Sequence, residues 1–460
     1  MSPLVEVKEY RTRWAGAGEQ LLDQIESRIE VRAQHAVAQY EELTLESAFQ
    51  PIISLAHGRA VGYEALVRAF PGRERRSVPP ADVFQRAKDR DEAVLVDGLC
   101  RALHLVNFEL QRAGDAWVFV NMTPSAILAM GAPDPLFPVL LNRRGIQPHQ
   151  VVIEILESKT YDERMLAEVV EHFRQLGCLV ALDDFGAGQS NFERIWRISP
   201  DVVKLDRSMV EEATRDPRVR RILPGLVGLL HEAGCLVVME GIETEEQALI
   251  AMEMDVDFVQ GFYFGRPDHI LSPPSPQRVE SLGQLFGKFR KRMAEHNVAT
   301  REALEPYTRT LERAALLVCD GVVLEIACVE LLQLPCVDRC YLLDADGVQV
   351  GKSTEAQHRR ARPDPRYLPF ANCEGANWGR RPYFRRAITR PKVVQISQPY
   401  LSMSDAKSCM TLSISIEQED TLLVLCVDLD WVSWESSNRS PMLRPAASLS
   451  WSELESEDAE

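Results

Sequence analysis

The chain has 460 residues, which is too long for one small binding module because domains usually contain ~100–200 residues. Hydrophobic residues make up 45% and charged residues 26%, an ordinary globular balance. The net charge of −16 argues against nonspecific binding to a nucleic-acid polymer or an anionic membrane. There is no apolar run of ~18 residues, and the polar start MSPLVEVKEYRTRW is unlike a signal peptide. We therefore expect a cytoplasmic protein that does not enter a membrane.

The order of apolar and amphipathic segments predicts the fold class. Residues 1–45 are mostly polar with a modest apolar stripe, and we predict an N-terminal helical arm. From about residue 48, short apolar runs alternate with helix-like stretches, and Thr244 and Gln247 have capping-box spacing before one of these. Strands that alternate with helices predict a parallel sheet covered by helices, either open and doubly wound or closed into a barrel.

Polar side chains fall in or at the end of six successive strand-like runs, and this pattern favours the barrel. They are Asn121, Glu154, Asp183 with Asp184, Lys204, Glu240 and Gln260. In a (β/α)8 barrel the carboxyl ends of the strands meet at one rim, where catalytic residues collect. We therefore predict a TIM-like barrel over residues 46–270.

Five carboxylates would share this rim: Glu64, Glu154, Asp183, Asp184 and Glu240. Carboxylates so close raise one another's pKa, so the cluster requires cations to stay ionised. Two divalent ions would balance it together with Lys204 and Arg68, and oxygen ligands without His or Cys favour Mg²⁺ or Mn²⁺ over zinc. Adjacent aspartates at a strand end can lie between two ions, the arrangement of two-metal phosphoester hydrolysis. Each motif alone has a commonplace explanation, but their joint order on successive strands does not.

Seven sequence blocks together resemble a known family. They are QPIISLAHGRAVGYEALVR, FVNM, IEILE, ALDDFGAGQSN, VVKLD, MEGIE and VQGFYFGRP. Over about residues 45 to 270 the chain resembles the EAL domain, a cyclic di-GMP phosphodiesterase barrel. The resemblance implies a TIM-like barrel with one antiparallel strand, two divalent cations (Mg²⁺ or Mn²⁺), and hydrolysis of cyclic di-GMP to linear pGpG. It also implies a homodimer.

The resemblance assigns a role to each matching residue. One metal ion would be held by Glu64, Asn121, Glu154 and Asp183, and the other by Asp183, Asp184 and Glu240. Lys204 would position and polarise the attacking water, and Arg68 would hold a substrate phosphate. Glu157 would pin the loop that follows the two aspartates, and Glu243 and Gln260 match positions beside the metal ligands or the water. The catalytic candidates are therefore Lys204, Glu64, Glu157 and Glu243, and the substrate-binding candidates are Arg68 and Gln260.

The loop DDFGAGQSN departs from the family at Gln189, where tyrosine is usual. Because that loop couples dimer contacts to metal geometry, the change bears on rate and regulation more than on chemistry. The chain has no GG(D/E)EF block, so it is not expected to synthesise cyclic di-GMP. Two alternatives to the enzyme are a cyclic di-GMP receptor without turnover and a scaffold whose barrel binds a protein partner. The complete set of metal ligands argues against both.

The rest of the chain predicts a second domain. Residues 271–325 pass from the proline-rich SPPSPQ into a charged helical pattern and are predicted to be a helical connector. RCYLLDADGVQVG predicts a hairpin turned at DADG, and VVQISQPYLS, SCMTLSISIE and TLLVLCVDLDW predict further antiparallel strands. With NWGRRPYFRRAI, these stretches make residues 326–435 resemble a PAS-like Cache domain, an α+β sensory module. Residues 436–460 end in WSELESEDAE and are predicted to be a disordered acidic tail.

A small-molecule ligand is expected in this second domain. The candidate contacts are Trp378, Arg381, Tyr383, Tyr400 and Asp428. Aromatic walls with one cation suit a small carboxylate-bearing ligand, and Asp428 could meet an amine. The alternative is that the aromatic side chains pack the domain core and Arg381 is a solvated surface charge.

Overall fold

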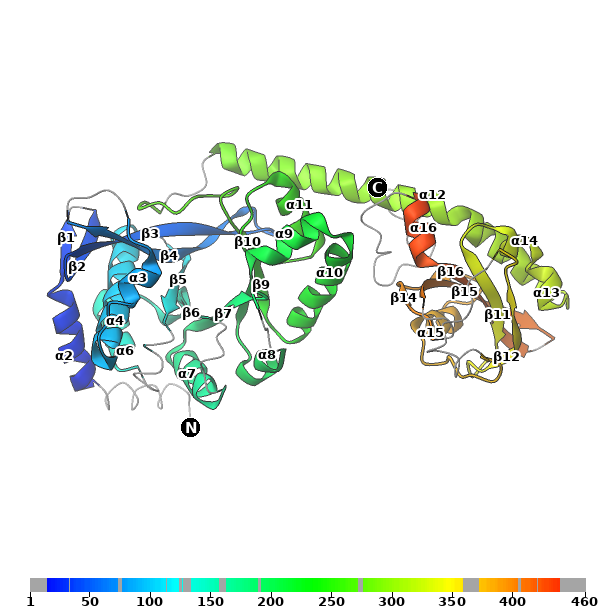
Figure 1. Ribbon diagram of the computed structural model, residues 1–460, viewed down its shortest axis with the longest axis horizontal. Helices are drawn as coiled ribbons and strands as arrows, with labels where there is room; N and C mark the ends of the chain where they lie inside the picture. The colour runs from blue at the N-terminus through cyan, green and yellow to red at the C-terminus, as the bar shows by residue number, and fades with distance from the viewer. Residues whose placement is uncertain are drawn as a thin grey trace. The chain divides into compact units, whose positions relative to one another are not determined.

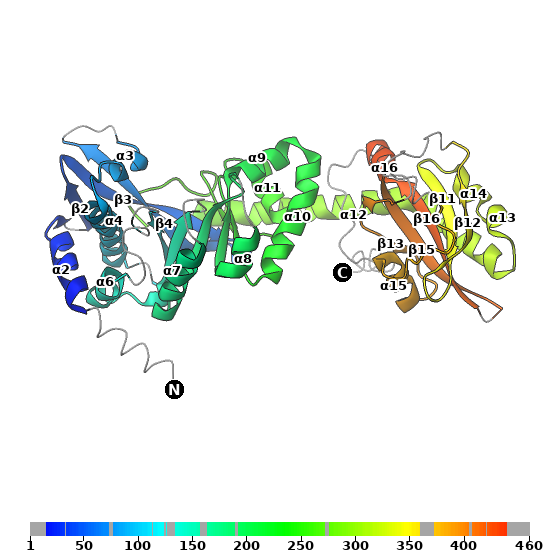
Figure 2. The same cartoon turned by 60° about the horizontal axis from the view of Figure 1, so that its bottom comes forward.

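The computed structural model describes residues 15–32, 34–72, 77–112, 114–123, 126, 134–156, 163–188, 192–271, 276–358, 372–403, 407–419 and 421–438. The chain divides into two compact units, Met1–Phe289 and Arg290–Glu460 (Figures 1 and 2). Glu157, Gln189 and residues 439–460 of the predicted tail lie outside the described residues. Within the described ranges, no helix is both long enough and apolar enough to cross a bilayer.

Eight strands close into a barrel in the first unit. Strand β3 (Leu43–Ser54) pairs antiparallel with both β4 (Arg59–Pro71) and β10 (Phe258–Gln260). All the remaining neighbours in the barrel pair in parallel. From β4 to β10 the strands follow in the order β5 (Trp117–Met122), β6 (Val151–Leu156), β7 (Leu179–Phe185), β8 (Val202–Leu205) and β9 (Leu236–Met239). The predicted TIM-like barrel with one antiparallel strand is therefore confirmed.

Helices surround the barrel strands (Figure 1). They are α3 (Pro80–Phe84), α4 (Arg90–Leu110), α6 (Leu136–Arg144), α7 (Glu163–Leu176), α8 (Phe192–Ile198), α9 (Arg207–Arg215), α10 (Pro217–Glu232) and α11 (Glu245–Glu253), with the short 3₁₀ turn η1 (Pro148–Gln150) before β6. Local sequence fixes where several of them begin. The side chain of Asp89 accepts a hydrogen bond from the Glu92 amide at the start of α4, and the predicted capping box between Thr244 and Gln247 opens α11.

The prediction of a helical arm over residues 1–45 is wrong for its second half. After α2 (Ala15–Glu26), the chain forms β1 (Ile29–Arg32) and β2 (His35–Tyr40), an antiparallel hairpin that continues the barrel sheet beyond β3. Along β2 the buried Ala36, Ala38 and Tyr40 are spaced by two residues and join the core of the first unit. A repeat of two belongs to a strand, and it overrides the weak helical stripe.

The second unit is an antiparallel α+β domain, as predicted. Its sheet has the order β12-β11-β16-β15-β13, with β14 also paired to β15. The strands are β11 (Val337–Leu343), β12 (Gln349–Glu355), β13 (Gln395–Ile396), β14 (Tyr400–Leu401), β15 (Ser408–Gln418) and β16 (Thr421–Asp430). The hairpin predicted at DADG joins β11 to β12, and Asp344 Oδ1 accepts hydrogen bonds from the amides of Asp346 and Val348 inside the turn.

Side chains of β16 alternate between the two faces of this sheet. Leu425, Val427 and Leu429 pack in one cluster with α13 (Leu324–Ala327), α14 (Val329–Gln333), α16 (Trp431–Asn438) and the end of α12 (Pro276–Cys319). Val424 and Cys426 pack in another cluster with Tyr383 of α15 (Pro382–Thr389). The same alternation places Asp428 on the α15 face.

The predicted connector, residues 271–325, is largely the single helix α12. The division between the two units falls inside this helix. Leu282 and Leu285 are buried in the core of the first unit, whereas Leu304 and Leu311 are buried in the core of the second. The segment therefore supplies core residues to both units.

Candidate active site

A layer of apolar side chains fills the barrel interior. Almost every strand contributes one member: Ile52, Phe119, Val152, Ala181, Val202, Val238 and Phe258. Because residues two apart on a strand face the same way, the next inward positions toward the carboxyl ends are Asn121, Glu154, Asp183, Lys204, Glu240 and Gln260. On β4 the corresponding pair is Gly62 and Glu64, and a Cβ on Gly62 would come 2.9 Å from the Phe119 ring. The polar layer therefore follows directly from the alternation of each strand.

Lys204 lies at the centre of this polar layer. Its Nζ is 2.6 Å from Glu154 Oε1, 2.6 Å from Glu240 Oε1, 3.1 Å from Asp183 Oδ1 and 3.3 Å from Glu64 Oε2. Only 1% of the Lys204 side chain is exposed. The structure thus brings together, around one ammonium group, four carboxylates that are spread over 177 positions of sequence between 64 and 240.

Burial and charge act in opposite directions on these groups. Burial acts to lower the pKa of Lys204, but the surrounding carboxylates outweigh it and hold the pKa well above its ordinary value. Burial, followed by the nearby charge of Glu64, raises the pKa of Glu154 well above the usual range. Burial also acts to raise the pKa of Glu64, but Lys204 and hydrogen bonds from Gln260 and Asn121 bring it below its ordinary value.

Asp184 lies at the site in an unusual backbone conformation. Its φ is +57°, in the left-handed region, and the pairing of β7 with β8 shifts register between Leu182 and Phe185. Asp183, Asp184 and Glu240 offer carboxylate oxygens that all lie within 4.8 Å of one another. Burial and Asp183 raise the pKa of Asp184 to about 6, and burial raises the pKa of Glu240 to about 8. A strained residue at such a cluster is typical of a functional site.

The donor set fits divalent cations. When all are ionised, the four carboxylates around the ammonium and the adjacent Asp184 leave a net charge of four negative units, which two divalent ions would balance. Glu154 Oε2 is buried and accepts no hydrogen bond from any residue in the described part of the chain. A buried carboxylate oxygen without a donor is costly unless it meets a cation, and oxygen-only ligands suit Mg²⁺, Mn²⁺ or Ca²⁺.

The mouth of the barrel holds a pocket of about 840 Å³, including its open entrance. Gln260 donates from Nε2 to Glu64 Oε2 at 2.5 Å and to Gln50 Oε1 at 3.2 Å, and Gln50 donates in turn to the Gly265 carbonyl. Gly261 must remain small because a Cβ there would lie 2.1 Å from the Ile242 carbonyl oxygen. These contacts fix the Gln260 amide against the carboxylate of Glu64.

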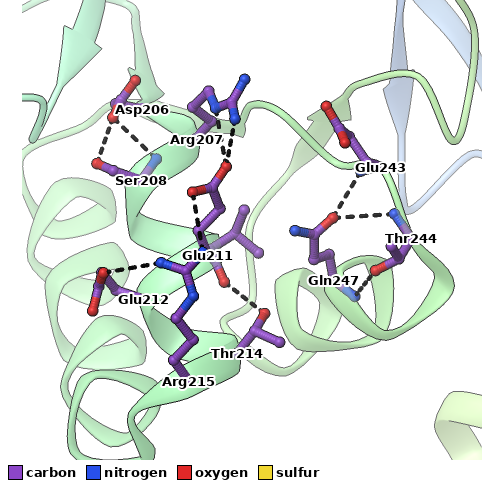
Figure 3. Close-up of polar contacts among 11 residues, drawn as sticks. Asp206, Arg207, Ser208, Glu211, Glu212, Thr214, Arg215, Glu243, Thr244 and Gln247 are labelled. Carbon is purple, nitrogen blue, oxygen red and sulfur yellow. Dashed lines mark hydrogen bonds and ion pairs between the residues drawn. The ribbon is translucent and has the colours of Figure 1, made fainter.

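Part of the pocket lining comes from the segments where β8 leads into α9 and β9 leads toward α11. Figure 3 shows the polar contacts of these segments. Asp206 accepts a hydrogen bond from the Ser208 amide. Arg207 donates a hydrogen bond from Nη2 to Oε1 of Glu211, on the same helix, at 2.7 Å. Glu243 lines the pocket, and its backbone amide donates to Gln247 Oε1 at 2.8 Å. Glu243 thus lies at the entrance rather than among the carboxylates around Lys204.

Arg68 lies apart from the pocket lining. Its side chain is half-buried, and Nη1 donates to the Val67 carbonyl at 3.1 Å. Burial lowers the pKa of Arg68, although the charge of Glu64 opposes the effect. Contact with a phosphate in the pocket would therefore require this guanidinium to turn.

Sequence reasoning missed Gln50, Asp206 and Arg207, which all line the pocket. Gln50 carried a usable signal, because it lies two residues before the interior residue Ile52 on the strand that runs the opposite way. Asp206 and Arg207 directly follow the VVKL strand. In the second unit, the five ligand candidates Trp378, Arg381, Tyr383, Tyr400 and Asp428 all line a single pocket.

Known proteins match this chain over the barrel domain and over both units. A family model described as the EAL domain matches residues 31–267. The uncharacterized EAL-domain containing protein YkuI of Bacillus subtilis is 26% identical over 397 residues, covering 83% of this chain and 93% of YkuI. A crystal structure of YkuI, in complex with substrate c-di-GMP and calcium, superposes with a TM-score of 0.71 at 24% identity, covering 84% of this chain and 96% of YkuI. This likeness shows that both units share the fold of YkuI.

Other relatives match about half of the chain. An uncharacterized protein of Azorhizobium caulinodans is 32% identical over 259 residues, covering 54% of this chain and 35% of that protein. The cyclic di-GMP phosphodiesterase RocR of Pseudomonas aeruginosa is 27% identical over 228 residues, covering 48% of this chain and 57% of RocR. The chain therefore spans about a third to somewhat over half of the length of these two relatives.

Proposed function

Because this chain belongs to the EAL domain family, we propose that its barrel hydrolyses cyclic di-GMP to linear pGpG with the help of two divalent cations, Mg²⁺ or Mn²⁺. The observation that carries the proposal is the convergence of four carboxylates on a buried lysine at the carboxyl ends of parallel strands, with the Asp184 carboxylate beside two of them. Degenerate sites that only bind a ligand have no need to retain such a costly arrangement. RocR is named a cyclic di-GMP phosphodiesterase, and the YkuI complex contains c-di-GMP, both of which agree with this substrate.

In this proposal, two groups of side chains each hold one cation. Glu64, Asn121, Glu154 and Asp183 would hold one cation, and Asp183, Asp184 and Glu240 the other. Bound divalent cations would neutralise a phosphate oxygen and lower the pKa of a water molecule. Lys204 would then hold the attacking oxygen by donating a hydrogen bond from Nζ, which the carboxylates keep protonated.

The remaining candidates have supporting roles in this proposal. Gln260 orients Glu64 through its short hydrogen bond, and Glu243 borders the entrance through which the dinucleotide must pass. Arg68 would contact a phosphate after leaving the Val67 carbonyl. Glu157 would hold the loop after Asp184. We also propose a homodimer and a sensory, PAS/Cache-like identity for the second unit, which sedimentation and ligand titration respectively can test.

The decisive experiment is incubation of the full chain with cyclic di-GMP and Mn²⁺, followed by chromatography of the nucleotides. Linear pGpG as the product supports the proposal. Bound but unchanged dinucleotide would indicate a receptor, and no binding would indicate a scaffold. Glu154→Gln, purified in parallel, is the control for a contaminating phosphodiesterase, because its buried carboxylate can hold a cation only when charged.

A further inference from the structure

A second group of buried charges lies in the first unit: Asp97 and Arg101 of α4, and Asp134 just before α6. Arg101 donates from Nε to Asp97 Oδ2 at 2.8 Å and from Nη1 to Asp134 Oδ2 at 2.7 Å. None of these side chains is more than 2% exposed, and none lines the pocket at the barrel mouth. Burying charges in this way rarely repays the desolvation cost, so stability alone does not account for the network.

The second carboxylate oxygen of Asp97 holds the backbone at the end of β5. Asp97 Oδ1 accepts a hydrogen bond from the Thr123 amide at 2.8 Å, and Thr123 directly follows the last residue of the strand. The Thr123 hydroxyl accepts in turn from the Ala126 amide at 3.3 Å. The network on α4 therefore fixes the point at which the chain leaves β5.

Asn121, a proposed metal ligand, lies two residues before this point. The pairing of β5 with β4 ends at Val120, whereas its pairing with β6 continues to Met122. The Asn121 side chain donates to Glu64 Oε1 at 3.3 Å, which is longer than the usual ~2.7–3.2 Å of a hydrogen bond. Since its side chain is held weakly, the position of the Asn121 amide oxygen depends on the backbone that Asp97 anchors.

The other end of the network holds a different part of the barrel wall. Asp134 Oδ1 accepts from the amides of Leu136 and Phe137 at 2.9 and 3.3 Å, at the start of α6. The Asp134 amide donates to His172 Nε2 of α7 at 3.2 Å. The two aspartates thus share one arginine and the same degree of burial, but only Asp97 contacts the strand that carries a proposed metal ligand.

We propose that Asp97 is a positioning residue for the metal site. Its carboxylate, held by Arg101, fixes the Thr123 amide and so places Asn121 for the cation. The inference rests on the proposed function only in that the carboxylates around Lys204 must bind a divalent cation. A partner that orients a metal ligand typically contributes about 10- to 100-fold to metal affinity.

Asp97→Ala and Asp134→Ala form a matched pair, because each removes one buried partner of Arg101. Melting curves in EDTA should show that both variants are destabilised. Calorimetric titration of the full chain with Mn²⁺, without nucleotide and below the melting range of every variant, should separate them. Asp97→Ala should bind one of the two ions about 10- to 100-fold more weakly, whereas Asp134→Ala should bind both as the unchanged chain does.

A double variant tests whether Asp97 acts through Asn121. Asp97→Ala combined with Asn121→Ala should bind Mn²⁺ no more weakly than Asn121→Ala alone, because residues that act through one contact are not additive. Additive losses in the double variant would overturn the proposal. An equal loss of Mn²⁺ affinity in Asp134→Ala would also overturn it, since the effect would then come from a weakened fold.

Circular dichroism establishes that each variant is folded. A folded Asp97→Ala that binds Mn²⁺ as tightly as the unchanged chain would overturn this inference alone, whereas no Mn²⁺ binding by the unchanged chain would overturn the proposed metal site as well. If Asp97→Ala does not fold, Asp97→Leu with Arg101→Met and Asp134→Leu replaces all three buried charges, an exchange that is often neutral for stability. Full Mn²⁺ affinity in that triple variant would overturn the proposal equally.

Discussion

The Nζ of Lys204 lies 2.6 Å from Glu154 Oε1, and neither side chain is exposed to more than 1%. The two residues come from β8 and β6, so the pair spans the intervening strand β7. A buried ion pair rarely repays its desolvation cost alone. Here the ammonium is shared with Glu64, Asp183 and Glu240, which makes Lys204 the charge that holds the ligand set together when no cation is bound.

Lys204→Met should therefore affect stability and turnover in different ways. Removing one partner of a buried ion pair costs about 3–5 kcal/mol, so the melting temperature in EDTA should fall clearly. Mn²⁺ should restore much of this loss, because the cations supply the missing positive charge. Turnover should fall by at least ~10²-fold while cyclic di-GMP binding changes little, since the proposed role is on the attacking oxygen.

The matched control for this variant is Lys288→Met. Lys288 lies 2.7 Å from Glu245, but its side chain is 54% exposed, and exposed pairs contribute only about 0–1 kcal/mol. Its melting temperature and turnover should stay close to those of the unchanged chain. A Lys204→Met protein that loses nucleotide binding together with turnover would contradict the proposed role.

Glu64→Gln tests one of the carboxylates of the cluster instead of its lysine. The substitution keeps the size of the side chain, but removes a charge that faces Lys204 and would ligate a cation. Turnover at saturating Mn²⁺ should fall by at least ~10²-fold, measured as pGpG formed per minute. Glu212→Gln, at an exposed position of α9, should leave turnover unchanged. Near-full activity in Glu64→Gln would show that the metal ligands are assigned wrongly.

The alternation of strand residues explains why so much of the barrel site could be predicted from sequence. Each apolar run ends with its polar residue two positions after an interior residue, as in Phe119 and Asn121 or Val202 and Lys204. Local spacing is sufficient there because parallel strands all end at the same rim. Gln50 was missed because its strand runs the other way, so its polar residue precedes the interior one.

Partners that are distant in sequence could not be predicted in this way. The sequence placed Asp428 near the aromatic candidates, but its pairing with Arg339 joins positions 89 residues apart on neighbouring strands. No local sequence pattern shows that the Asp428 carboxylate is already paired with Arg339. The hairpin of β1 and β2 was missed for a related reason, since strands of 4 and 6 residues become recognisable only through their pairing with each other and with β3.

The response to metal should depend on pH. In the metal-free protein, burial raises the pKa of Glu240 from 4.5 to about 8, so the folded state holds this proton more tightly than the unfolded chain. Stability from this group is fully present below the unfolded value and is lost as pH rises through the folded value. The metal-free protein should therefore weaken between about pH 4.5 and 8. Cations compete with this proton, so their affinity should rise over the same range.

Melting curves at pH 6 and pH 8.5, with EDTA or with Mg²⁺, measure this dependence. The rise in melting temperature on adding Mg²⁺ should be larger at pH 8.5. Glu240→Gln, which carries no proton to displace, should respond to Mg²⁺ weakly and almost equally at both values. An equal Mg²⁺ response of the unchanged chain at the two pH values would contradict the prediction.

Gly261→Ala should destabilise the barrel mouth. The added methyl would meet the backbone of Ile242 at 2.1 Å, and backbone cannot move aside as a flexible side chain can. A loss of about 1–3 kcal/mol or more is expected from urea unfolding, the usual cost of overpacking. In contrast, Gly228→Ala lies in α10 with nothing within 4 Å of the new methyl and should stabilise by about 0.4–1 kcal/mol. If both variants unfold alike, steric conflict is not what Gly261 avoids.

The last prediction concerns regulation of the barrel by the second unit through α12. Three chains are compared at equal Mn²⁺ and cyclic di-GMP: full length, residues 1–297, and residues 1–271. The shortest lacks Leu282 and Leu285, which are buried in the core of the first unit, so it should melt at a lower temperature than residues 1–297. A regulatory unit can shift activity only by its coupling free energy, usually about 1–3 kcal/mol, so turnover of residues 1–297 should differ from the full chain by about 5–150-fold. Identical turnover and identical sedimentation of these two chains would show that the second unit does not control the barrel.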